Sequence, residues 1–464
     1  MFMKSFDAIV IGAGQAGVPL AKKLAAAGWK TVLIEKRWIG GTCINDGCTP
    51  TKTMVASARM AYMAGKSKDL GVDIPAYRLN FKTVMQRKDH LVSLFREGAV
   101  RGIEKTPNLS VVYGEAKFIA DHQVQVMKED RADLFEAKHI FINTGALPFV
   151  PEIEGLSEIK FLTSTSIMEL EDVPSHLLIV GGGYIGMEFG QMFKRFGAEV
   201  TLLEQGDRLL PHEDEDVCRE MSTVFQEEGI KVLLQTKAIR FENYGDVRIR
   251  VTTLTDGEEV KHLCSHVLIA SGRDPQTRML GLENTNIICN DQGYIKVNDH
   301  LETDVKGVYA LGDVKGGPAF THIAYNDHLV LIDHLLHGEK KGIKGRLLPY
   351  CMFTDPQLGR VGINELQAKE LDLDIIVAKI PMKNVARALE NGETRGFMKA
   401  IADKKSKLLL GAAVIGEQGG EIMSILQMAM VGKITYDQIR KMIFAHPLYA
   451  ESLNNLFMSL DDKS

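Results

Sequence analysis

The chain has 464 residues, of which 45% are hydrophobic and 25% are charged. These values are typical of globular proteins and exclude a wholly disordered chain, and at about 150 residues per domain the length suggests three domains. The net charge of −5 argues against a nucleic-acid-binding protein with a broad basic surface. No run of about 18 apolar residues occurs, so no membrane span is expected.

The first part of the chain could be mistaken for an export signal. Asp7 opens its apolar run, Lys22 and Lys23 close it, and a glycine motif lies inside it. We therefore expect a mature protein that begins near Met1 and is cytoplasmic. In that reducing compartment the six cysteines would not form a disulfide scaffold, and a close pair would be catalytic or metal-binding.

A nucleotide-binding pattern opens the chain. Residues 6–11 predict a buried strand, which is followed directly by Gly12-Ala13-Gly14-Gln15-Ala16-Gly17. A helical segment at 18–27 and a strand at 31–34 come next, and the strand ends at Glu35. The glycines allow a tight turn that brings the backbone close to a pyrophosphate, and the acid can bind ribose hydroxyls.

The same pattern recurs later in the chain. A strand at 177–180 precedes Gly181-Gly182-Gly183-Tyr184-Ile185-Gly186, and a helical segment then leads to a strand at 200–203 that ends at Glu204. In both copies the acid lies 23 positions after the first glycine, from 12 to 35 and from 181 to 204. Glycines that serve only helix–strand packing are the alternative, but packing does not explain the two glutamates.

Two dinucleotide sites in one chain predict an electron relay between two cofactors. The carboxylate of Glu204 would repel a 2′-phosphate, which favours NAD(H) over NADP(H). Arg208 lies a few residues further on, and it keeps NADP(H) possible.

A close cysteine pair lies between Gly40 and Lys52. Cys43 and Cys48 are separated by four residues, and they can reach disulfide geometry if the turn between them is tight. A helix is expected to begin around 48–50 and to run through 64, and a thiol at its start, with Lys52 one turn on, should have a lowered pKa. A zinc site and ordinary buried thiols are the alternatives. No second Cys/His pair lies nearby, and the surrounding residues are unlike a core.

The stretch from Gly40 to Lys52 resembles the redox-active disulfide signature of the class I pyridine nucleotide–disulfide oxidoreductases, which include dihydrolipoamide dehydrogenase, glutathione reductase and mercuric reductase. Four further stretches resemble family motifs in the same order, namely 144–148, 272–275, 307–313 and 353–356. The resemblance implies an α/β protein with two Rossmann-like dinucleotide-binding domains, for FAD and NAD, and a C-terminal α+β dimerisation domain. The implied ranges are 1–150 and 273–345 for FAD binding, 151–272 for NAD(P) binding and 346–464 for dimerisation.

The resemblance also implies roles for single residues. NAD(P)H would reduce FAD, and FAD would reduce the Cys43–Cys48 disulfide, with Cys48 against the flavin and Cys43 toward the substrate. Lys52 would lie near the flavin N5 and pair with Glu188; the alternative is a solvated helix lysine. The implied FAD-binding residues are Gly12, Gly14, Gly17, Glu35, Gly41, Thr42, Lys52, Thr144, Gly145, Arg273, Gly312 and Asp313. Those implied for NAD are Gly181, Gly183, Gly186, Glu204, Gly272 and Tyr184, the last either covering the nicotinamide or simply starting a helix.

A histidine near the C-terminus is the candidate base. Pro447 suits the first position of a helix, which would place His446 just ahead of the helix and Glu451 little more than a turn inside it. Glu451 could then reach the imidazole and fix its tautomer. A lone histidine is more often structural, but this pattern resembles the catalytic dyad that reaches the disulfide of the partner subunit. A homodimer is therefore implied.

Stretches that differ between branches of the family indicate which branch this chain resembles. Residues 448–450 are Leu-Tyr-Ala, whereas dihydrolipoamide dehydrogenases usually carry Thr-Leu-Ser. The chain lacks the terminal vicinal cysteines of mercuric reductases and has His446 where they have tyrosine. Residues 48–53, 320–327 and 451–457 nevertheless resemble the mercuric-reductase-like, reactive-chlorine-resistance flavoprotein branch.

The sequence therefore predicts an FAD-dependent NAD(P)H oxidoreductase that passes electrons through Cys43–Cys48 to a metal ion or a small disulfide. No metal ion is expected as a resident cofactor, because no dedicated ligand cluster is visible, and no nucleic-acid or membrane partner is expected. Dihydrolipoamide dehydrogenase is the first alternative. A non-catalytic flavoprotein subunit is the second.

Overall fold

The computed structural model describes residues 2–129, 131–246 and 248–461. The chain divides into two compact units. The first consists of residues 1–53, 85–149 and 272–346, and the second consists of residues 54–84, 150–271 and 347–464. Among the described residues, none of the helices is long and apolar enough to span a membrane. The four domain ranges given above stay predictions.

The first unit is built on a seven-stranded sheet in the order β3-β2-β1-β6-β5-β4, with β16 also paired to β6. The ladders β3-β2-β1-β6-β16 are parallel, whereas β4, β5 and β6 form an antiparallel meander. A separate antiparallel ladder joins β7 to β15. The strands are β1 (Met3–Ile11), β2 (Thr31–Glu35), β3 (Leu109–Tyr113), β4 (Glu115–Ala120), β5 (Gln123–Lys128), β6 (Arg131–Ile142), β7 (Ala146–Pro148), β15 (Arg273–Pro275) and β16 (Val308–Ala310).

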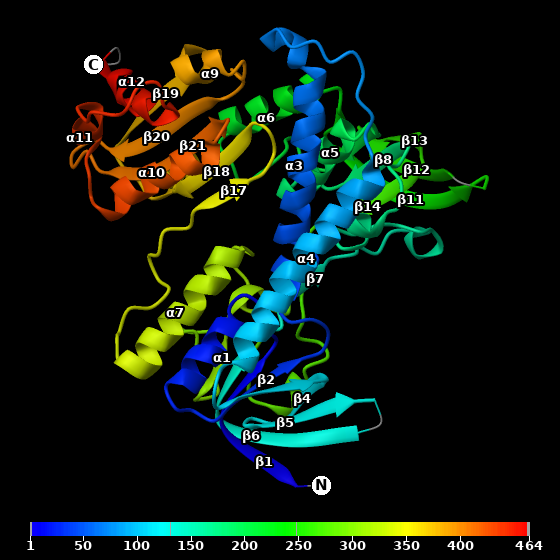
Figure 1. Cartoon of the computed structure of the whole chain (residues 1–464), viewed down its shortest axis with the longest axis vertical. Coiled ribbons are helices and arrows are strands. Elements are labelled where there is room, and N and C mark those ends of the chain that lie inside the picture. The colour runs from blue at the N-terminus through cyan, green and yellow to red at the C-terminus, as the bar shows by residue number, and fades with distance from the viewer. Residues whose placement is uncertain (1, 130, 247, 462–464) are drawn as a thin grey trace. The chain divides into compact units, whose positions relative to one another are not determined.

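Apolar residues cover both faces of this sheet, as a parallel sheet requires. Ile9 and Ile11 of β1 face one core cluster, while Ala8 and Val10 face another that includes Leu20 of α1. Helices α1 and α7 lie side by side over this second face (Figure 1). The helices that lie wholly in this unit are α1 (Gly17–Ala26), α2 (Gly41–Asn45) and α7 (Thr321–His337), with 3-10 turns at η4 (Leu282–Asn284) and η5 (Gly312–Lys315). Helices α3 (Cys48–Gly65) and α4 (Phe81–Glu104) each have one part in the first unit and one in the second, and η1 (Ser67–Leu70) belongs to the second.

The second unit contains a four-stranded parallel sheet, β10-β9-β8-β14, and a three-stranded antiparallel sheet, β11-β12-β13. Helix α5 packs on β8 and β9, and eight of its residues from Gly186 to Phe193 are buried. The elements are η2 (Leu156–Glu158), η3 (Ser166–Glu169), β8 (His176–Val180), α5 (Tyr184–Arg195), β9 (Glu199–Leu203), α6 (Glu215–Glu227), β10 (Lys231–Leu233), β11 (Thr236–Tyr244), β12 (Arg248–Thr255), β13 (Glu258–Cys264) and β14 (His266–Ile269).

The same unit contains a five-stranded antiparallel sheet in the order β17-β18-β21-β20-β19. Helix α10 covers β18 and β21, and α12 contacts β19 and β20 (Figure 1). The elements are β17 (Tyr350–Met352), β18 (Gln357–Gly362), α8 (Glu365–Glu370), β19 (Ile375–Pro381), η6 (Met382–Asn384), α9 (Ala386–Glu390), β20 (Phe397–Asp403), β21 (Leu409–Gly416), α10 (Gly419–Val431), α11 (Tyr436–Arg440), η7 (Tyr449–Glu451) and α12 (Ser452–Met458).

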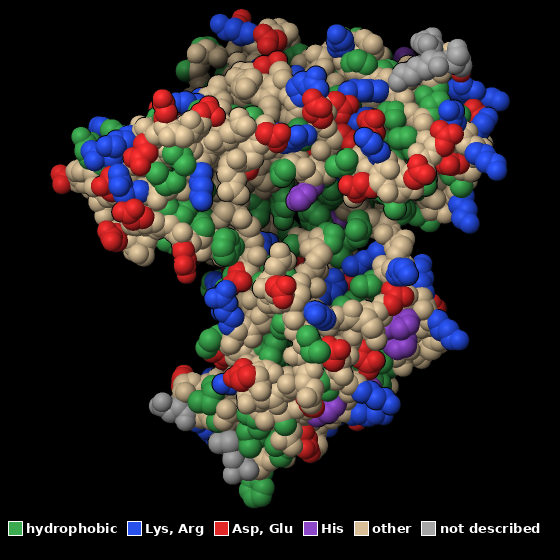
Figure 2. Space-filling model, turned by 180° about the vertical axis from the view of Figure 1, so that it is seen from behind, with side chains coloured by type: hydrophobic (Ala, Val, Ile, Leu, Met, Phe, Trp, Pro, Cys, Tyr) green, Lys and Arg blue, Asp and Glu red, His purple; other side chains and the backbone are tan. Residues whose placement is uncertain are grey.

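The structure confirms the predicted α/β class and both strand–turn–helix–strand units, as well as the start of α3 at Cys48. The prediction that Pro447 begins a helix is wrong. Leu448 has an extended backbone with φ −93° and ψ 155°, so helical geometry begins only with η7 and continues in α12. On the face shown in Figure 2, Lys and Arg side chains alternate with Asp and Glu, and no large area of one sign is visible.

Candidate functional site

The first glycine turn joins β1 to α1 and is closely packed. Gly12 has φ +102°, and a Cβ there would lie 2.3 Å from the carbonyl oxygen of Asn143. The carboxylate of Glu35, at the end of β2, accepts a hydrogen bond from the Ala13 N–H at 2.8 Å. Only glycine can occupy the first position of this turn, and the acid lies directly against it.

The second glycine turn joins β8 to α5 with nearly the same geometry. Gly181 has φ +117°, and a Cβ there would lie 2.5 Å from the carbonyl oxygen of Ala270. Glu204, just after β9, accepts hydrogen bonds from the N–H of Gly182 at 2.8 Å and from the N–H of Gly206 at 2.7 Å. The two predicted units therefore share both their turn and the position of their acid.

The second turn leaves open space for a pyrophosphate group, because a Cβ on Gly183 would meet no described atom within 4 Å. At the first turn a Cβ on Gly14 would lie 2.9 Å from the side-chain amide of Asn143, so glycine is needed there for close packing. Each turn also leads directly into the N-terminus of a helix, where backbone N–H groups favour an anion. The residues present thus fit a dinucleotide at each turn.

Arg273 and Asp313 form a second half of the predicted FAD site. Arg273 donates to the carbonyl oxygen of Ala146 at 2.5 Å, and its Nε lies 3.8 Å from an Asp313 carboxylate oxygen. This Nε is buried and has no hydrogen-bond partner among the described residues. Burial raises the pKa of Asp313, whereas the nearby charges of Arg273 and Lys315 oppose that shift. A buried donor without a partner beside a desolvated acid fits a bound polar chain such as that of FAD.

Asp327 holds the Gly312–Asp313 turn, and the sequence analysis assigned it no role. The fully buried carboxylate of Asp327 accepts a hydrogen bond from the Gly312 N–H at 2.9 Å. Its charge is balanced by Lys315 at 3.2 Å and Arg346 at 2.6 Å. Asp327 lies in the stretch 320–327 that indicated the branch of the family, but no motif in the sequence indicates its hydrogen bond with Gly312.

The two cysteines lie on consecutive helices. Cys43 lies in α2 and Cys48 is the first residue of α3, and the sulfur of Cys48 lies 3.1 Å from the hydroxyl oxygen of Thr321. The pKa of the Cys43 thiol is raised, first by its hydrogen bond with Cys48, then by burial and by the charge of Cys48, whereas Thr321 and Lys52 oppose the shift. Cys43 is therefore the thiol that keeps its proton at neutral pH. The lowered pKa expected for the thiol at the start of α3, Cys48, stays a prediction.

The cysteine segment is tied to the first glycine turn. The Gly40 N–H donates to the carbonyl oxygen of Ala13 at 2.8 Å. The side chain of Asn45 donates to the carbonyl oxygen of Gly41 at 2.8 Å and accepts from Arg96 at 2.6 Å. These bonds hold the short helix that carries Cys43 beside the turn predicted to bind FAD. No motif in the sequence indicates these roles of Asn45 and Arg96.

The remaining predicted residues lie at element ends. Thr144 donates to the carbonyl oxygen of Gln276 at 2.9 Å, where β7 meets β15. Glu188 is buried on α5 and accepts a hydrogen bond from the Phe353 N–H at 2.7 Å. Its predicted pairing with Lys52 stays a prediction. The others lie as follows: Gly17 and Gly186 at the first turns of α1 and α5, Tyr184 at the start of α5, Gly41 and Thr42 in α2, and Gly145 and Gly272 beside the β7–β15 ladder.

The predicted histidine–glutamate contact is present. Nδ1 of His446 lies 2.9 Å from a carboxylate oxygen of Glu451. Glu451 closes η7, so the contact bridges an extended turn instead of a helix. The side chain of His446 is 70% exposed, which leaves its other ring nitrogen accessible.

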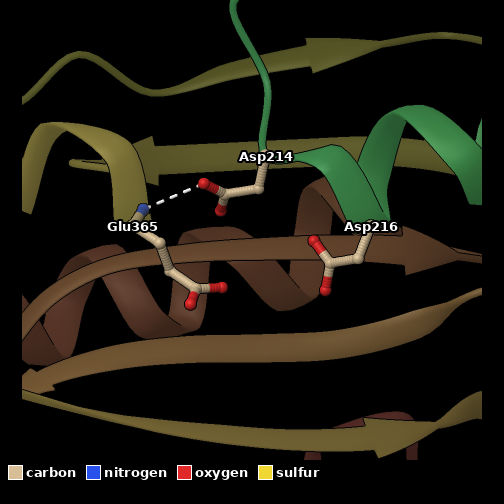
Figure 3. A group of neighbouring side chains, drawn as sticks. All are labelled: Asp214, Asp216 and Glu365. Atoms are coloured by element: carbon tan, nitrogen blue, oxygen red, sulfur yellow. Dashed lines mark hydrogen bonds between the residues drawn. The ribbon is translucent and has the colours of Figure 1, made fainter.

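Three carboxylates, those of Asp214, Asp216 and Glu365, converge in the second unit (Figure 3). The ammonium group of Lys399 lies 2.8 Å from Asp214, 2.7 Å from Asp216 and 2.6 Å from Glu365. Lys379 adds a second cation at 2.6 Å from Asp216. The lysines account for this cluster as an ion-pair network around the buried ammonium group of Lys399.

Comparison with known proteins agrees with this geometry. Residues 6–327 match the family model described as pyridine nucleotide-disulphide oxidoreductase, and residues 348–457 match the dimerisation domain of that family. The probable pyridine nucleotide-disulfide oxidoreductase RclA of Escherichia coli (strain K12) is 37% identical, over 98% of this chain and 99% of its own. A solved Cu(II) complex of the HOCl-induced flavoprotein disulfide reductase RclA matches with a TM-score of 0.90 at 36% identity, covering 98% of this chain and 99% of that chain.

Enzymes with two other activities are also similar. A mercuric reductase of Lysinibacillus sphaericus is 31% identical over 98% of this chain and 83% of its own. A dihydrolipoyl dehydrogenase of Bacillus subtilis (strain 168) is 34% identical over 96% of this chain and 94% of its own. The resemblance stated from the sequence is confirmed. The chain belongs to the pyridine nucleotide-disulphide oxidoreductase family of flavoprotein enzymes and carries the dimerisation domain of that family.

Proposed function

We propose that this enzyme passes electrons from NADH through FAD to a Cys43–Cys48 disulfide, and from the resulting thiols to a metal ion or a small disulfide. The observation that carries the proposal is the placement of the two cysteines, with Cys43 on the short helix α2 and Cys48 at the start of α3, where Cys48 raises the pKa of the Cys43 thiol. Hydrogen bonds tie the segment holding these thiols to a turn that fits a dinucleotide. The flavin, when bound, supplies the hydride acceptor and the electron path to the sulfurs.

The chain's own residues would manage the thiol protons. Cys43 keeps its proton because Cys48 raises its pKa, so Cys43 needs a base before it can attack an acceptor. We assign that base to His446 of the partner subunit, oriented by Glu451. For a disulfide acceptor, the Cys43 sulfur would attack one acceptor sulfur and the other would leave with the proton. Cys48 would then attack Cys43, closing the Cys43–Cys48 bond and releasing the second acceptor thiol.

A second copy of this chain would cover an exposed apolar face near the dyad. Ile425, Met428 and Val431 lie on one face of α10 and are 39%, 72% and 66% exposed. Ile443, three residues before His446, is fully exposed as well. A face of this kind is typical of a subunit interface. The dimerisation domain supports the same assignment, because it includes all four residues.

NADH is the proposed reductant. The carboxylate of Glu204 lies at the second glycine turn, where the ribose of the nucleotide would bind and where a 2′-phosphate would be repelled. Arg208 forms two hydrogen bonds with the neighbouring Asp207, at 2.8 and 2.7 Å. This pairing directs the guanidinium toward an adjacent carboxylate instead of presenting it for a phosphate.

An anaerobic titration with NADH tests the relay. The disulfide and the flavin each accept two electrons, so the oxidised enzyme should take up about two equivalents of NADH. The Cys48→Ser variant should take up about one equivalent of NADH, and its flavin absorbance should fall from the first addition. Uptake of about one equivalent by the unmodified enzyme would contradict the disulfide relay.

Turnover assays distinguish the acceptors. The relative RclA was solved as a Cu(II) complex, and another relative is a mercuric reductase, so we expect NADH oxidation with Cu(II), Hg(II) or a small disulfide. The dihydrolipoyl dehydrogenase relative supports the alternative activity. Fast reduction of NAD⁺ by dihydrolipoamide, with negligible turnover of the metal ions, would replace our proposal with that alternative.

A further inference from the structure

The segment that carries the histidine is a strap of mostly exposed residues, 441–448, between two buried anchors; only Phe444 and Pro447 within it are partly buried, and Phe444 packs against the core of the domain. Ile439 is 3% exposed and Tyr449 is 5% exposed. At the first anchor, the side chain of Asn454 donates to the carbonyl oxygens of Ile439 at 3.0 Å, Arg440 at 3.1 Å and Met442 at 3.1 Å. These bonds satisfy carbonyl groups at the end of α11 and fix one end of the strap.

The second anchor is the phenol of Tyr449. Its hydroxyl donates to a carboxylate oxygen of Glu417 at 2.8 Å, and the same oxygen accepts from the amide of Asn391 at 2.7 Å. The other oxygen of Glu417 accepts from Arg59. Tyr449 lies two residues before Glu451, which contacts His446. The anchor is therefore close along the chain to the dyad.

The charges favour this hydrogen bond. Burial tends to raise the pKa of Glu417, but hydrogen bonds from Asn391, Tyr449 and Arg59 outweigh burial, so the pKa is lowered and the carboxylate is an anion at neutral pH. Burial and the contact with Glu417 raise the pKa of Tyr449, so its phenol stays a donor. A hydrogen bond from a neutral donor to a buried anion is among the stronger ones in proteins.

The contacts also lead back to the helix of the redox cysteines. Arg59 lies on α3, the helix that begins at Cys48. Arg59 is paired with Glu417, and Glu417 holds Tyr449. One line of polar contacts thus runs from the helix that begins at the redox pair to the strap that carries the candidate base.

We infer that Tyr449 is a positioning residue: its hydrogen bond to Glu417 fixes the strap so that the His446–Glu451 dyad is held ready to take the proton of Cys43 in the partner subunit. The inference rests on the function proposed above. Tyr449 also occupies the stretch in which this chain departs from the lipoamide-enzyme pattern. The positioning role proposed for Tyr449 therefore falls in the part of the dyad segment in which this chain differs from the lipoamide enzymes.

The test is the rate at which iodoacetamide alkylates Cys43 in the NADH-reduced holoenzyme, measured against pH with the modified peptide identified by mass spectrometry. Tyr449→Phe removes only the hydroxyl and leaves Glu417 its bonds to Asn391 and Arg59. We expect alkylation near neutral pH to slow about tenfold, with the pH profile displaced upward. His446→Ala should slow it about a hundredfold. Glu417→Gln, which keeps an acceptor oxygen, should fall between Tyr449→Phe and the unmodified enzyme.

The double variant separates positioning from general damage. If Tyr449 acts through His446, adding Tyr449→Phe to His446→Ala should cause no further slowing. Tyr436→Phe is the matched control, because Tyr436 lies on α11 of the same domain and its ring stacks on Phe457; its rate should be unchanged. Equal slowing by Tyr449→Phe in both backgrounds, or no slowing in either, would overturn the inference. No effect of His446→Ala would overturn the proposed base itself.

Discussion

The two glycine turns are nearly the same structure used twice. A Cβ would clash with a carbonyl oxygen at 2.3 Å on Gly12 and at 2.5 Å on Gly181. In each unit a terminal glutamate, Glu35 or Glu204, accepts a hydrogen bond at 2.8 Å from the N–H of the residue after the first glycine. Identical spacing in the sequence therefore produces closely similar turns.

The two strand–turn–helix–strand repeats differ in the segment that follows their glutamate. After Glu35 the chain forms α2 and starts α3, which together carry Cys43 and Cys48. After Glu204 it forms a polar turn in which Arg208 pairs with Asp207. The strand–turn–helix–strand unit that occurs twice fits a nucleotide. Only the first copy is followed by a segment that carries redox-active cysteines, so this segment adds the redox chemistry. Binding and chemistry can thus be tested separately in this molecule.

The largest expected effect lies in the segment that only the first unit has. Cys48→Ser should lower turnover of any acceptor at least about a thousandfold, because no disulfide can form. Flavin content and the first reduction by NADH should be unchanged. Cys351→Ser is the matched control, since Cys351 is also a partly exposed thiol, and it should turn over normally in the same stopped-flow and steady-state assays. Full activity of Cys48→Ser would show that the added segment carries no chemistry.

The second prediction tests whether the two cradles hold different cofactors. Gly183→Ala places a methyl group where no described atom lies within 4 Å, so the fold should tolerate it while the KM for NADH rises about tenfold through contact with the pyrophosphate. Gly14→Ala should instead weaken FAD binding and leave the KM for NADH unchanged once flavin is saturating. Retained FAD and the KM for NADH are the measurements. If Gly183→Ala weakened FAD retention and Gly14→Ala raised the KM for NADH, the two cofactors would have to be assigned to the opposite turns.

Much of this architecture could be predicted because it depends on local patterns. Strand, glycine turn, helix and acid succeed one another within about 25 residues, and each has its own sequence signal. The contact between His446 and Glu451 was predictable for the same reason, since only five positions separate them. The helix predicted at Pro447 was wrong because the extended backbone of Leu448 delays the helix, and a proline at a turn gives the same local signal as one at a helix start.

Most contacts that sequence reasoning missed join residues far apart in the chain. Thr321 contacts Cys48 from 273 positions away, and Glu417 contacts Arg59 from 358 positions away. No periodic pattern in the sequence connects such pairs, so these contacts are seen only in the folded structure. The nucleotide cradles depend on local spacing, whereas the supports of the thiols depend on tertiary contacts.

The third prediction compares the two acids. Glu204→Gln removes the charge beside the ribose, so the KM for NADH should rise about tenfold, in line with the loss of a hydrogen bond to a charged group. The preference for NADH over NADPH should shrink, because the repulsion of the 2′-phosphate is lost. Glu35→Gln should leave both values unchanged and only weaken FAD retention. An unchanged ratio of kcat/KM for the two nucleotides in Glu204→Gln would show that Glu204 does not set the preference.

The smallest effect is expected at Arg208, in the turn that follows Glu204. Arg208 is exposed and already paired with Asp207, and exposed pairs of this kind contribute little. Arg208→Ala should therefore change the KM for NADH by about twofold or less. A large rise in the KM for NADPH alone would mean that the guanidinium leaves Asp207 to bind the 2′-phosphate, and the second cradle would then accept both nucleotides. Because Glu204 would still repel that phosphate, the double variant Glu204→Gln with Arg208→Ala decides between attraction and repulsion as the source of the preference.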